Sequence, residues 1–288
     1  MSSMKAKLID GKAVSAALRE QLKSEVETLA EEGITPGLAV VIVGDDSASK
    51  VYVKNKEKAC AELGIYSEKY ELPAETTQEE LLALVAKLNV KPDIDGILVQ
   101  LPLPAHLDEN SVIAAISPDK DVDAFSAANV GRIMLGDYKF LPCTPAGIME
   151  LLKEYNISIA GKRCVVLGRS NIVGKPMALL LMQNDGTVTT CHTKTEGMET
   201  YTREADILVS AAGHRGLVTG DMVKEGAVVI DVAMNRNEEG KFCGDVDFDA
   251  VEKKASYITP VPGGVGPMTR AILLKNMLTA AKRHLGVE

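Results

Sequence analysis

The stretch CVVLGRSNIVGKPMALLL, residues 164–181, reads as a buried strand, a glycine turn and the start of a helix. The G-x-G-x-x-G fingerprint of dinucleotide-binding turns would place three glycines here. These positions hold Gly168, Ser170 and Val173, and Gly174 follows one residue late, so the glycine match alone is weak. A second strand, TVTTCH, nevertheless follows at the expected distance. The segment predicts a Rossmann-like unit that holds a phosphate at a helix N-terminus; a strand–turn–helix without a ligand is the alternative.

The end of that second strand bears on the choice of nicotinamide cofactor. NAD-binding units usually carry an acid here that binds the ribose, but residues 189–195 contain no carboxylate. Arg169, Thr193 and Lys194 are instead available to a 2′-phosphate. The sequence therefore favours NADP over NAD as the cofactor.

Apolar runs alternate with helical patterns along the whole chain. Most of the runs are nearly continuous and β-branched, which is typical of strands buried on both faces of a parallel sheet. We expect strands at 37–44, 96–100, 163–168, 187–192, 206–212, 227–233 and 256–261. We expect helices near 12–32, 49–63, 77–89, 145–154, 174–184 and 268–285. This alternation predicts an α/β protein with parallel sheets.

The stretch from residue 117 to residue 145 is the densest break in this pattern, poor in periodicity and rich in Asp, Gly and Pro. We place the domain junction inside it. Residues 1–141 are expected to form an N-terminal α/β catalytic domain, and residues 142–266 a Rossmann-like dinucleotide-binding domain. The C-terminal helix, 267–288, is expected to pack back on the first domain. Because ligands tend to bind between domains, we expect a cleft between the two.

Composition argues against several other classes of protein. The chain has 288 residues, 46% hydrophobic and 25% charged, which is ordinary for a globular protein. Its net charge of −8 argues against a nucleic-acid or anionic-membrane surface. The five scattered cysteines include no C-x-x-C pair, which argues against a metal site or a disulfide framework. The N-terminus lacks the apolar core of a signal peptide, and no apolar run approaches the ~20 residues of a membrane span, so a soluble cytoplasmic protein is expected.

A second stretch, KVYVKNKEKACAELG, begins at Lys50 and holds four lysines on a predicted helix. At roughly 100° per residue, Lys50, Lys54 and Lys58 fall on the polar side. Lys56 falls in a mostly apolar arc, one turn after Tyr52. Its stem can lie on apolar surface while the ammonium reaches water, or it can be a partly desolvated amine that serves as a base near neutral pH. The periodicity alone favours the first interpretation.

Three further features fall where ligands commonly bind. Gln100 stands at the carboxyl end of a buried strand, where open α/β sheets bind ligands, although a bond to loop backbone would explain it equally well. Asp121 and Asp123 of KDVDAF lie in the presumed junction, although acids in loops usually form turns or caps. The loop TPVPGGVGPMTR (259–270) holds glycines that permit close backbone approach to a flat ligand, but it can also be a plain connection.

Several motifs occur together and in order: Tyr52-x-x-x-Lys56, VQLPLP, KDVD, PCTP, GRSNIVGKP, CHTKT and PVPGGVGPMT. Together they closely resemble the bifunctional methylenetetrahydrofolate dehydrogenase/methenyltetrahydrofolate cyclohydrolase family, from about residue 8 to the C-terminal helix. PVPGGVGPMT is highly specific, whereas the glycine turn is not. The resemblance implies NADP-dependent oxidation of 5,10-methylenetetrahydrofolate to 5,10-methenyltetrahydrofolate and its hydrolysis to 10-formyltetrahydrofolate. It also implies a homodimer.

The resemblance further implies roles for individual residues. Tyr52 would orient or stack on the folate, Lys56 would be the catalytic amine, and Gln100 would bond to that amine and tune it. Asp123, the second acid of its motif, would hold the pterin edge. The other binding residues it implies are Pro262, Gly263 and Gly264 for the folate, and Gly168, Arg169, Ser170, Gly174 and Thr193 for NADP. With Gln100 and Asp123 beside it, Lys56 is expected to be catalytic, chiefly in the hydrolysis.

Two positions depart from the family pattern. Ala124 stands where the family usually has Gly, which questions the local turn, and Thr193 stands where Ser is typical, which keeps the donor but adds a methyl group. Two other functions stay open. A Rossmann-type dehydrogenase of another small substrate would leave Tyr52, Gln100 and PVPGG unexplained. A non-catalytic nucleotide- or folate-binding regulator is disfavoured by the intact set of candidate catalytic residues.

Overall fold

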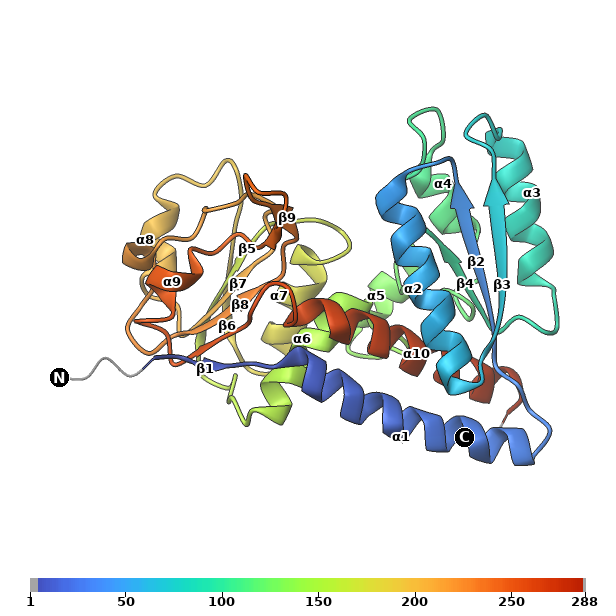
Figure 1. The fold of residues 1–288 in the computed structure, drawn as a ribbon, viewed down its shortest axis with the longest axis horizontal. Coiled ribbons are helices and arrows are strands. Elements are labelled where there is room, and N and C mark those ends of the chain that lie inside the picture. The colour runs from blue at the N-terminus through green and yellow to red at the C-terminus, as the bar shows by residue number, and fades with distance from the viewer. Residues whose placement is uncertain (1–4, 287–288) are drawn as a thin grey trace. The chain divides into compact units, whose positions relative to one another are not determined.

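The computed structural model describes residues 5–286. These residues form two compact units, each built on its own sheet (Figure 1). Unit 1 comprises the described chain up to Ala16 and Pro142–Thr269, and unit 2 comprises Ala17–Leu141 and the described chain from Arg270 on. Helices α1 (Gly11–Glu31) and α10 (Val265–His284) each begin in unit 1 and end in unit 2. Within residues 5–286, no helix combines the length and the apolar character that crossing a bilayer requires.

Unit 1 contains a six-stranded parallel sheet in the order β1-β11-β8-β7-β5-β6. Its strands are β1 (Lys7–Leu8), β5 (Arg163–Leu167), β6 (Thr187–Cys191), β7 (Ile207–Ser210), β8 (Val228–Asp231) and β11 (Tyr257–Ile258). The strand order reverses at β5, because β6 lies on one side of it and the next strand, β7, lies on the other. Open α/β sheets bind ligands outside the carboxyl ends of their strands at such a point.

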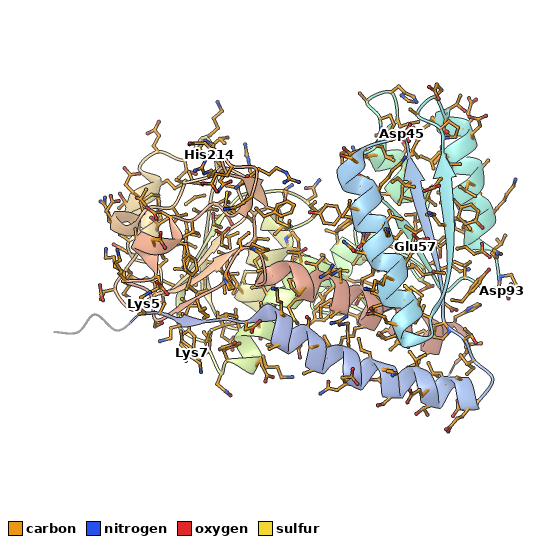
Figure 2. All side chains as sticks on the ribbon, in the orientation of Figure 1. Lys5, Lys7, Asp45, Glu57, Asp93 and His214 are labelled. Atoms are coloured by element: carbon orange, nitrogen blue, oxygen red, sulfur yellow. The ribbon has the colours of Figure 1, made fainter. Side chains whose placement is uncertain are left out.

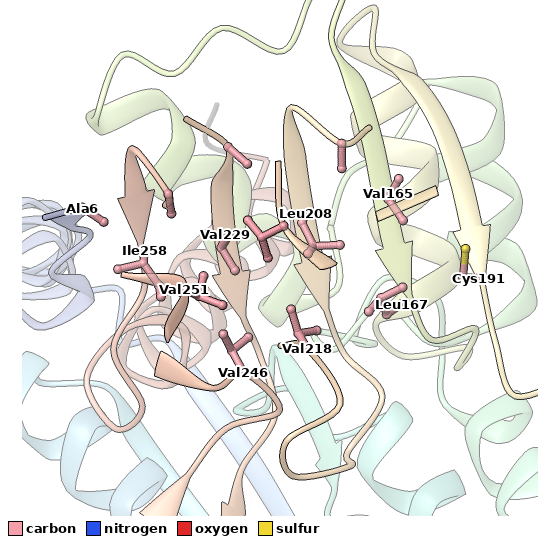
Figure 3. Close-up of a cluster of buried hydrophobic side chains, with 14 residues drawn as sticks. Ala6, Val165, Leu167, Cys191, Leu208, Val218, Val229, Val246, Val251 and Ile258 are labelled. Atoms are coloured by element: carbon pink, nitrogen blue, oxygen red, sulfur yellow. The ribbon is translucent and has the colours of Figure 1, made fainter. Parts of the chain in front are cut away.

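Helices and a buried apolar cluster support the unit 1 sheet. Helix α7 (Gly174–Gln183) packs on β5 and β6, and α6 (Cys143–Glu154) packs on α7. The cluster joins side chains of five strands to Val218, Val246 and Val251 from the later part of the unit (Figure 3). The shorter elements here are α8 (Met198–Thr202), η1 (Gly220–Met222), β9 (Asn235–Arg236), β10 (Phe242–Cys243) and α9 (Phe248–Val251).

Unit 2 contains a three-stranded parallel sheet in the order β3-β2-β4, formed by β2 (Gly37–Val43), β3 (Tyr66–Leu72) and β4 (Gly96–Val99). Side chains alternate along a strand, so Ala39, Val41 and Val43 share one face. They pack in a buried cluster with α3 (Gln78–Asn89) and α4 (Glu109–Ala115). Helix α2 (Ser47–Leu63) lies on the other side of this sheet from α3 (Figure 1), and α5 (Ala127–Leu135) follows later.

Each strand and helix predicted from the apolar pattern is present, with ends that differ by three residues at most. The pattern missed β3, α4 and α5, and also the short elements β1, α8, η1, β9, β10 and α9. Strand β3, YSEKYEL, is an edge strand whose side chains are only partly covered, and edge strands commonly carry charge. Helix α5 lies inside the stretch 117–145 that was expected to be irregular, and Ser126 caps it by accepting a hydrogen bond from the Asn129 backbone N–H.

The division into units differs from the predicted domains at the N-terminus. The predicted first domain, residues 1–141, includes the described chain before Ala17, which belongs to unit 1. The reason is that β1 pairs with β11, a contact between opposite ends of the chain that no local pattern signals. At the C-terminus, Asn276 of α10 donates to the carbonyl oxygens of Val122 (2.8 Å) and Leu141 (2.9 Å), both in unit 2.

Candidate active site

Helix α2 carries the candidate catalytic lysine, and both of its ends are capped. Asp46 accepts a hydrogen bond from the Ser49 backbone N–H at 2.7 Å, and Gly64 ends the helix with φ 77°. The buried side chains on its inner face are Ser49, Val53, Ala59, Cys60 and Leu63. Lys56 is half-buried at the border of this face.

The other three lysines of the stretch are exposed, as the periodicity predicts. Lys50 pairs with Asp45 at 2.6 Å, and Lys58 lies 3.7 Å from Glu62 one turn along the helix. Asp45, labelled in Figure 2, stands just before α2. Exposed pairs of this kind contribute little to stability, so these lysines are ordinary surface charge.

Lys56 is set apart by a hydrogen bond from its Nζ to Gln100 Oε1 at 3.1 Å. The Gln100 amide is fixed in turn, because its Nε2 donates to the Leu101 carbonyl at 2.7 Å and its backbone N–H donates to Val41 at 2.8 Å. Lysine only donates and a backbone carbonyl only accepts, so the orientation of the amide is dictated by chemistry. The structure therefore aims the Gln100 carbonyl at the Lys56 amine, while the catalytic roles of the two residues stay predictions.

The direction of α2 explains how Lys56 reaches the end of β4. Helix side chains lean toward the helix N-terminus, and α2 begins just after the carboxyl end of β2. Since β2 and β4 are parallel neighbours, their carboxyl ends share one edge of the sheet. Cys60, one turn further on, is no competing nucleophile, because burial raises the pKa of its thiol to about 12 and it stays protonated.

The two acids of KDVDAF differ in their surroundings. Asp121 is buried, and its carboxylate accepts hydrogen bonds from the backbone N–H groups of Phe125 (3.2 Å) and Ser126 (2.8 Å) and from Asn129 Nδ2 (2.9 Å). It therefore holds the turn that leads into α5. Asp123 is half-buried. Of the two, Asp123 is thus the better candidate for binding a substrate.

Ala124 occupies a conformation that ordinarily favours glycine. Its φ is 57°, in the left-handed region, and its side chain is fully buried. Its backbone N–H donates to the Asp121 carbonyl at 3.0 Å, which closes the turn. Ala124 therefore adopts the same left-handed turn that a glycine would suit at this position, although the family usually has Gly here.

All four candidate catalytic residues belong to unit 2, where Lys56 and Gln100 are in direct contact. Tyr52 is 44% exposed and precedes Lys56 by one turn of α2, so its ring is accessible to a ligand. Gln100 and Asp123 follow β4 along the chain. The candidate folate residues Pro262, Gly263 and Gly264 belong to unit 1, and their place beside the folate stays a prediction.

The loop that holds those three residues rests on the start of α1. Gly263 adopts φ 117°, and its carbonyl accepts a hydrogen bond from the Lys12 backbone N–H at 3.1 Å. A Cβ on Gly11 would lie 1.7 Å from the Gly264 carbonyl oxygen. The glycines therefore serve close packing of backbone on backbone, which fixes the shape of the loop within unit 1.

The glycine turn after β5 fits a dinucleotide phosphate. Gly168 adopts φ 116°, and a Cβ there would lie 2.4 Å from the Ala211 carbonyl oxygen. A Cβ on Gly174 would lie 2.3 Å from the Gly168 carbonyl oxygen. Ser170 replaces the second glycine, and its Oγ accepts hydrogen bonds from the N–H groups of Val173 (3.1 Å) and Gly174 (3.2 Å). The turn is thus tight, and the start of α7 lies beside it, as phosphate binding requires.

The turn after β6 presents the candidate 2′-phosphate residues. His192 accepts a hydrogen bond at Nδ1 from the Lys194 backbone N–H (3.1 Å), and its own backbone N–H donates to Thr195 Oγ1 (2.9 Å). The side chains of Thr193 and Lys194 are exposed, as is that of Arg169 after the neighbouring strand. One hydroxyl and two cations at adjacent strand ends are groups suited to a phosphate.

Sequence reasoning missed two buried acids in unit 1. Asp231 ends β8 and is 4% exposed, and Asp245, just after β10, is fully buried. Burial raises the pKa of the Asp231 carboxyl to about 6, although backbone N–H groups that donate to it oppose the rise. The available signal is an acid at the end of an apolar run, VVID, which places a carboxyl at the carboxyl end of a buried strand.

A glycine turn at the strand-order reversal and a lysine–glutamine pair at the end of a second sheet define an enzyme of the dinucleotide-binding α/β class. The family model for the tetrahydrofolate dehydrogenase/cyclohydrolase catalytic domain matches residues 9–123. The model for the NAD(P)-binding domain of the same family matches residues 142–285. The chain therefore belongs to the tetrahydrofolate dehydrogenase/cyclohydrolase family.

Individual relatives agree with this assignment. The bifunctional protein FolD of Acetivibrio thermocellus is 58% identical over 279 residues, which is 97% of this chain and 98% of the relative. The FolD crystal structure from Campylobacter jejuni is 52% identical, covers 96% of this chain and 99% of its own, and superposes with a TM-score of 0.95. The Trypanosoma brucei FolD, complexed with NADP and an inhibitor, is 44% identical over 98% of this chain and 99% of its own, with a TM-score of 0.94.

These comparisons decide between the functions that the residues left open. The predicted α/β fold with a catalytic domain and a Rossmann-like NAD(P)-binding domain is confirmed. The prediction of a bifunctional methylenetetrahydrofolate dehydrogenase/methenyltetrahydrofolate cyclohydrolase is also confirmed. A dehydrogenase of an unrelated small substrate and a non-catalytic regulator are therefore set aside.

Proposed function

We propose that the two reactions rely on different groups of this chain. Lys56, oriented by Gln100, transfers protons in the hydrolysis of methenyltetrahydrofolate, and the glycine turn with Arg169 holds NADP for the oxidation that precedes it. The observation that carries the proposal is the 3.1 Å hydrogen bond between Lys56 Nζ and Gln100 Oε1, whose amide is fixed on Leu101. A half-buried amine held at a strand end is suited to proton transfer.

The oxidation requires alignment rather than proton transfer. In 5,10-methylenetetrahydrofolate the reacting carbon lies between two nitrogens, whose lone pairs assist the departure of a hydride. NADP+ when bound accepts that hydride. Since no proton moves, the residues of the chain contribute by orienting the substrate. Tyr52 is suited to stack on the folate, and Asp123 to accept hydrogen bonds from the pterin edge.

The hydrolysis requires a group that moves protons. Water attacks the carbon of the methenyl cation and must lose a proton, and a ring nitrogen must gain one as the ring opens. Lys56 can accept the first proton as an amine or supply the second as an ammonium. Gln100 holds one N–H of Lys56 in a fixed direction, so the amine is oriented before the substrate arrives. The loop at Pro262, Gly263 and Gly264 is proposed to line the folate site.

We also propose that the chain prefers NADP to NAD. The absence of a carboxylate from residues 189–195 supports this, as do the exposed Arg169 and Thr193 at adjacent strand ends. A charge-assisted hydrogen bond contributes roughly 1.5–3 kcal/mol, so Arg169→Ser should raise the KM for NADP+ by about 10- to 100-fold. The KM for NAD+, which has no 2′-phosphate, should change little.

The control for this experiment is an arginine at the other end of the same strand. Arg163 begins β5 and pairs with Glu204 at 2.5 Å on the surface of unit 1. Arg163→Ser should leave the KM for both cofactors unchanged. Equal losses for NADP+ and NAD+ in Arg169→Ser would contradict the assignment of Arg169 to the 2′-phosphate.

The cellular setting and the assembly are also proposals. We propose a cytoplasmic enzyme, supported by scattered cysteines of which Cys60, Cys143, Cys164 and Cys191 are buried thiols. We propose a homodimer, supported by the family resemblance. Light scattering on the purified protein tests the dimer, and a monomer mass across the working concentration range would contradict it.

The overall proposal is tested with the purified protein, 5,10-methylenetetrahydrofolate and each nicotinamide in turn. We expect reduction of NADP+ and formation of 10-formyltetrahydrofolate in the same reaction. Hydrolysis of methenyltetrahydrofolate should also proceed without any nicotinamide, because that step transfers only protons and water. Failure to reduce either nicotinamide would contradict the proposal.

A further inference from the structure

Asp245 carries a fully buried carboxylate and is not one of the candidate site residues. Its side chain accepts five hydrogen bonds, from Ser210 Oγ (2.9 Å), Asn235 Nδ2 (3.0 Å) and the backbone N–H groups of Ala212 (2.9 Å), Gly213 (3.2 Å) and His214 (2.6 Å). Every partner is a donor. A carboxylate is the side chain that meets such a set, because an amide would turn an NH₂ group toward some of the donors.

Three of these donors are consecutive residues of the loop that follows β7. Successive backbone N–H groups that converge on one point form a concave anion site, or nest. Here the anion is the side chain of Asp245, so the loop from Ala212 to His214 is wrapped around a charge of the protein itself. His214, which makes the shortest of the three bonds, is labelled in Figure 2.

The same loop borders the glycine turn. The backbone N–H of Ala211 donates to the Leu167 carbonyl at 2.8 Å. The Ala211 carbonyl oxygen occupies the space that a Cβ on Gly168 would require, at 2.4 Å. Strands β5 and β7 are the neighbours at which the strand order reverses. The position of this loop therefore limits the room around the turn proposed to hold the dinucleotide.

Asp245 is itself held rigidly. Its backbone N–H donates to Asp231 Oδ1 at 3.0 Å, and the N–H of Val246 donates to Asp231 Oδ2 at 2.9 Å. Gly244 packs so closely that a Cβ there would lie 1.9 Å from the Asp231 carboxylate. Val246 pairs with Val218 in a parallel bridge, and both lie in the buried cluster of Figure 3. The backbone around Asp245 is therefore held in place, and this fixes the position of the carboxylate that binds the loop.

We propose that Asp245 is a positioning residue for the nicotinamide dinucleotide, acting through the loop 211–214; the inference rests on the proposed cofactor site at Gly168. None of the five hydrogen-bond donors to Asp245 is a candidate 2′-phosphate residue, so removal of this carboxylate should weaken the binding of NADP+ and NAD+ alike. This pattern differs from that expected for Arg169, which should affect NADP+ alone. A purely structural role would instead lower stability and leave the affinity of the folded protein for both cofactors unchanged.

The test is Asp245→Asn, with the Kd for NADP+ and for NAD+ measured by calorimetry. We expect both Kd values to rise by about ten-fold or more, because the loop loses at least one buried charge-assisted hydrogen bond that holds it in the conformation that binds the dinucleotide. The hydrolysis of methenyltetrahydrofolate, measured without nicotinamide, reports folding of the full chain and should persist. Asp206→Asn is the matched control, because Asp206 accepts the Arg163 backbone N–H at the amino end of β7, away from the loop. Its Kd values should match those of the wild type.

A milder variant guards against loss of folding. Asn235→Ala removes one donor to Asp245 and leaves the carboxylate in place, so both Kd values should rise by about two- to five-fold, as one neutral hydrogen bond implies. Unchanged Kd values in folded Asp245→Asn and Asn235→Ala would overturn the inference. If Arg169→Ser weakens NADP+ in the same experiment while both of these variants bind normally, the role of Asp245 fails and the proposed cofactor site stands. If Arg169→Ser also binds normally, both are overturned.

Discussion

At the scale of single residues, the neighbours of a side chain decide what it can do. Lys56 shares its helix with three other lysines, and periodicity alone separates it only as a border residue. What distinguishes it is Gln100, which comes 44 positions later in the chain. The same holds for the two acids of KDVDAF, because hydrogen bonds from the turn before α5 and from Asn129 in its first turn occupy the Asp121 carboxylate. Sequence motifs nominated these residues, but their pairing requires the fold.

Ala124 gives a prediction about stability. A β-branched side chain is poorly tolerated at φ 57° and would find no space at a fully buried site. Ala124→Val should therefore reduce the free energy of unfolding by more than about 2 kcal/mol. Ala124→Gly should stay within about 1 kcal/mol of the wild type, because relief of the left-handed conformation is offset by loss of a buried methyl group and by a more flexible unfolded chain.

Urea unfolding of the purified variants measures these differences. Ala127, exposed in the first turn of α5, is the control, and Ala127→Val should cost less than about 1 kcal/mol. A destabilisation of Ala124→Val no larger than that of Ala127→Val would contradict the role assigned to the left-handed turn.

At the scale of elements, apolar runs predicted the buried strands well because both faces of β2, β7 and β8 are covered. The same reasoning failed for β3, whose polar side chains suit an exposed edge. It also failed for α5, whose nine residues lie in a stretch dominated by turn formers. The spacing of the glycines in the turn after β5 matched the dinucleotide-binding fingerprint only weakly. The packing shows why glycine is required at Gly168 and Gly174, because each lies against a backbone carbonyl.

Gly174→Ala tests the packing of this turn. The added Cβ would meet the Gly168 carbonyl oxygen at 2.3 Å, and backbone on both sides limits relaxation. We expect the Kd for NADP+ to rise by about ten-fold or more, because a shift of the helix N-terminus misplaces the phosphate donors. Gly131 in α5 is the control, since a Cβ there meets nothing within 4 Å. Gly131→Ala should bind NADP+ normally and be slightly more stable; normal binding by Gly174→Ala as well would contradict the fit of the turn.

At the scale of the whole molecule, contacts between distant parts of the chain were the least predictable. The pairing of β1 with β11 joins positions 250 residues apart and assigns the described chain before Ala17 to unit 1. A two-residue strand is too short to show a periodic pattern, so this pairing could not be predicted from the sequence and is seen only in the folded sheet. The buried acids Asp231 and Asp245 were missed for the same reason, because their partners come from separate loops.

Asp231 makes the stability of the protein depend on pH. Its pKa is raised from 3.8 to about 6 in the folded chain, chiefly by burial, so the folded state binds the proton more tightly than the unfolded state. This contribution to stability is fully present below pH 4 and is lost as the pH rises through about 6. The rise in pKa corresponds to roughly 3 kcal/mol.

The measurement is urea unfolding at several pH values for the wild type and Asp231→Asn. Asparagine does not ionise, so the stability of the wild type relative to the variant should increase as the pH falls from 7 to 4 and level off below that. Carboxyl groups remote from Asp231 titrate in both proteins and cancel in the comparison. A difference that is constant over this range, or that changes in the opposite direction, would contradict the raised pKa.

The most direct test of the division of roles is Lys56→Met, assayed for both reactions. The substitution keeps a long side chain and removes the amine. General acid–base groups typically contribute about 10²- to 10⁴-fold, so hydrolysis of methenyltetrahydrofolate should fall by that factor. Oxidation of methylenetetrahydrofolate with NADP+ should fall far less, and Lys54→Met, on the exposed side of α2, should leave both rates unchanged. Hydrolysis at the wild-type rate in Lys56→Met would show that this lysine does not carry the proton transfer.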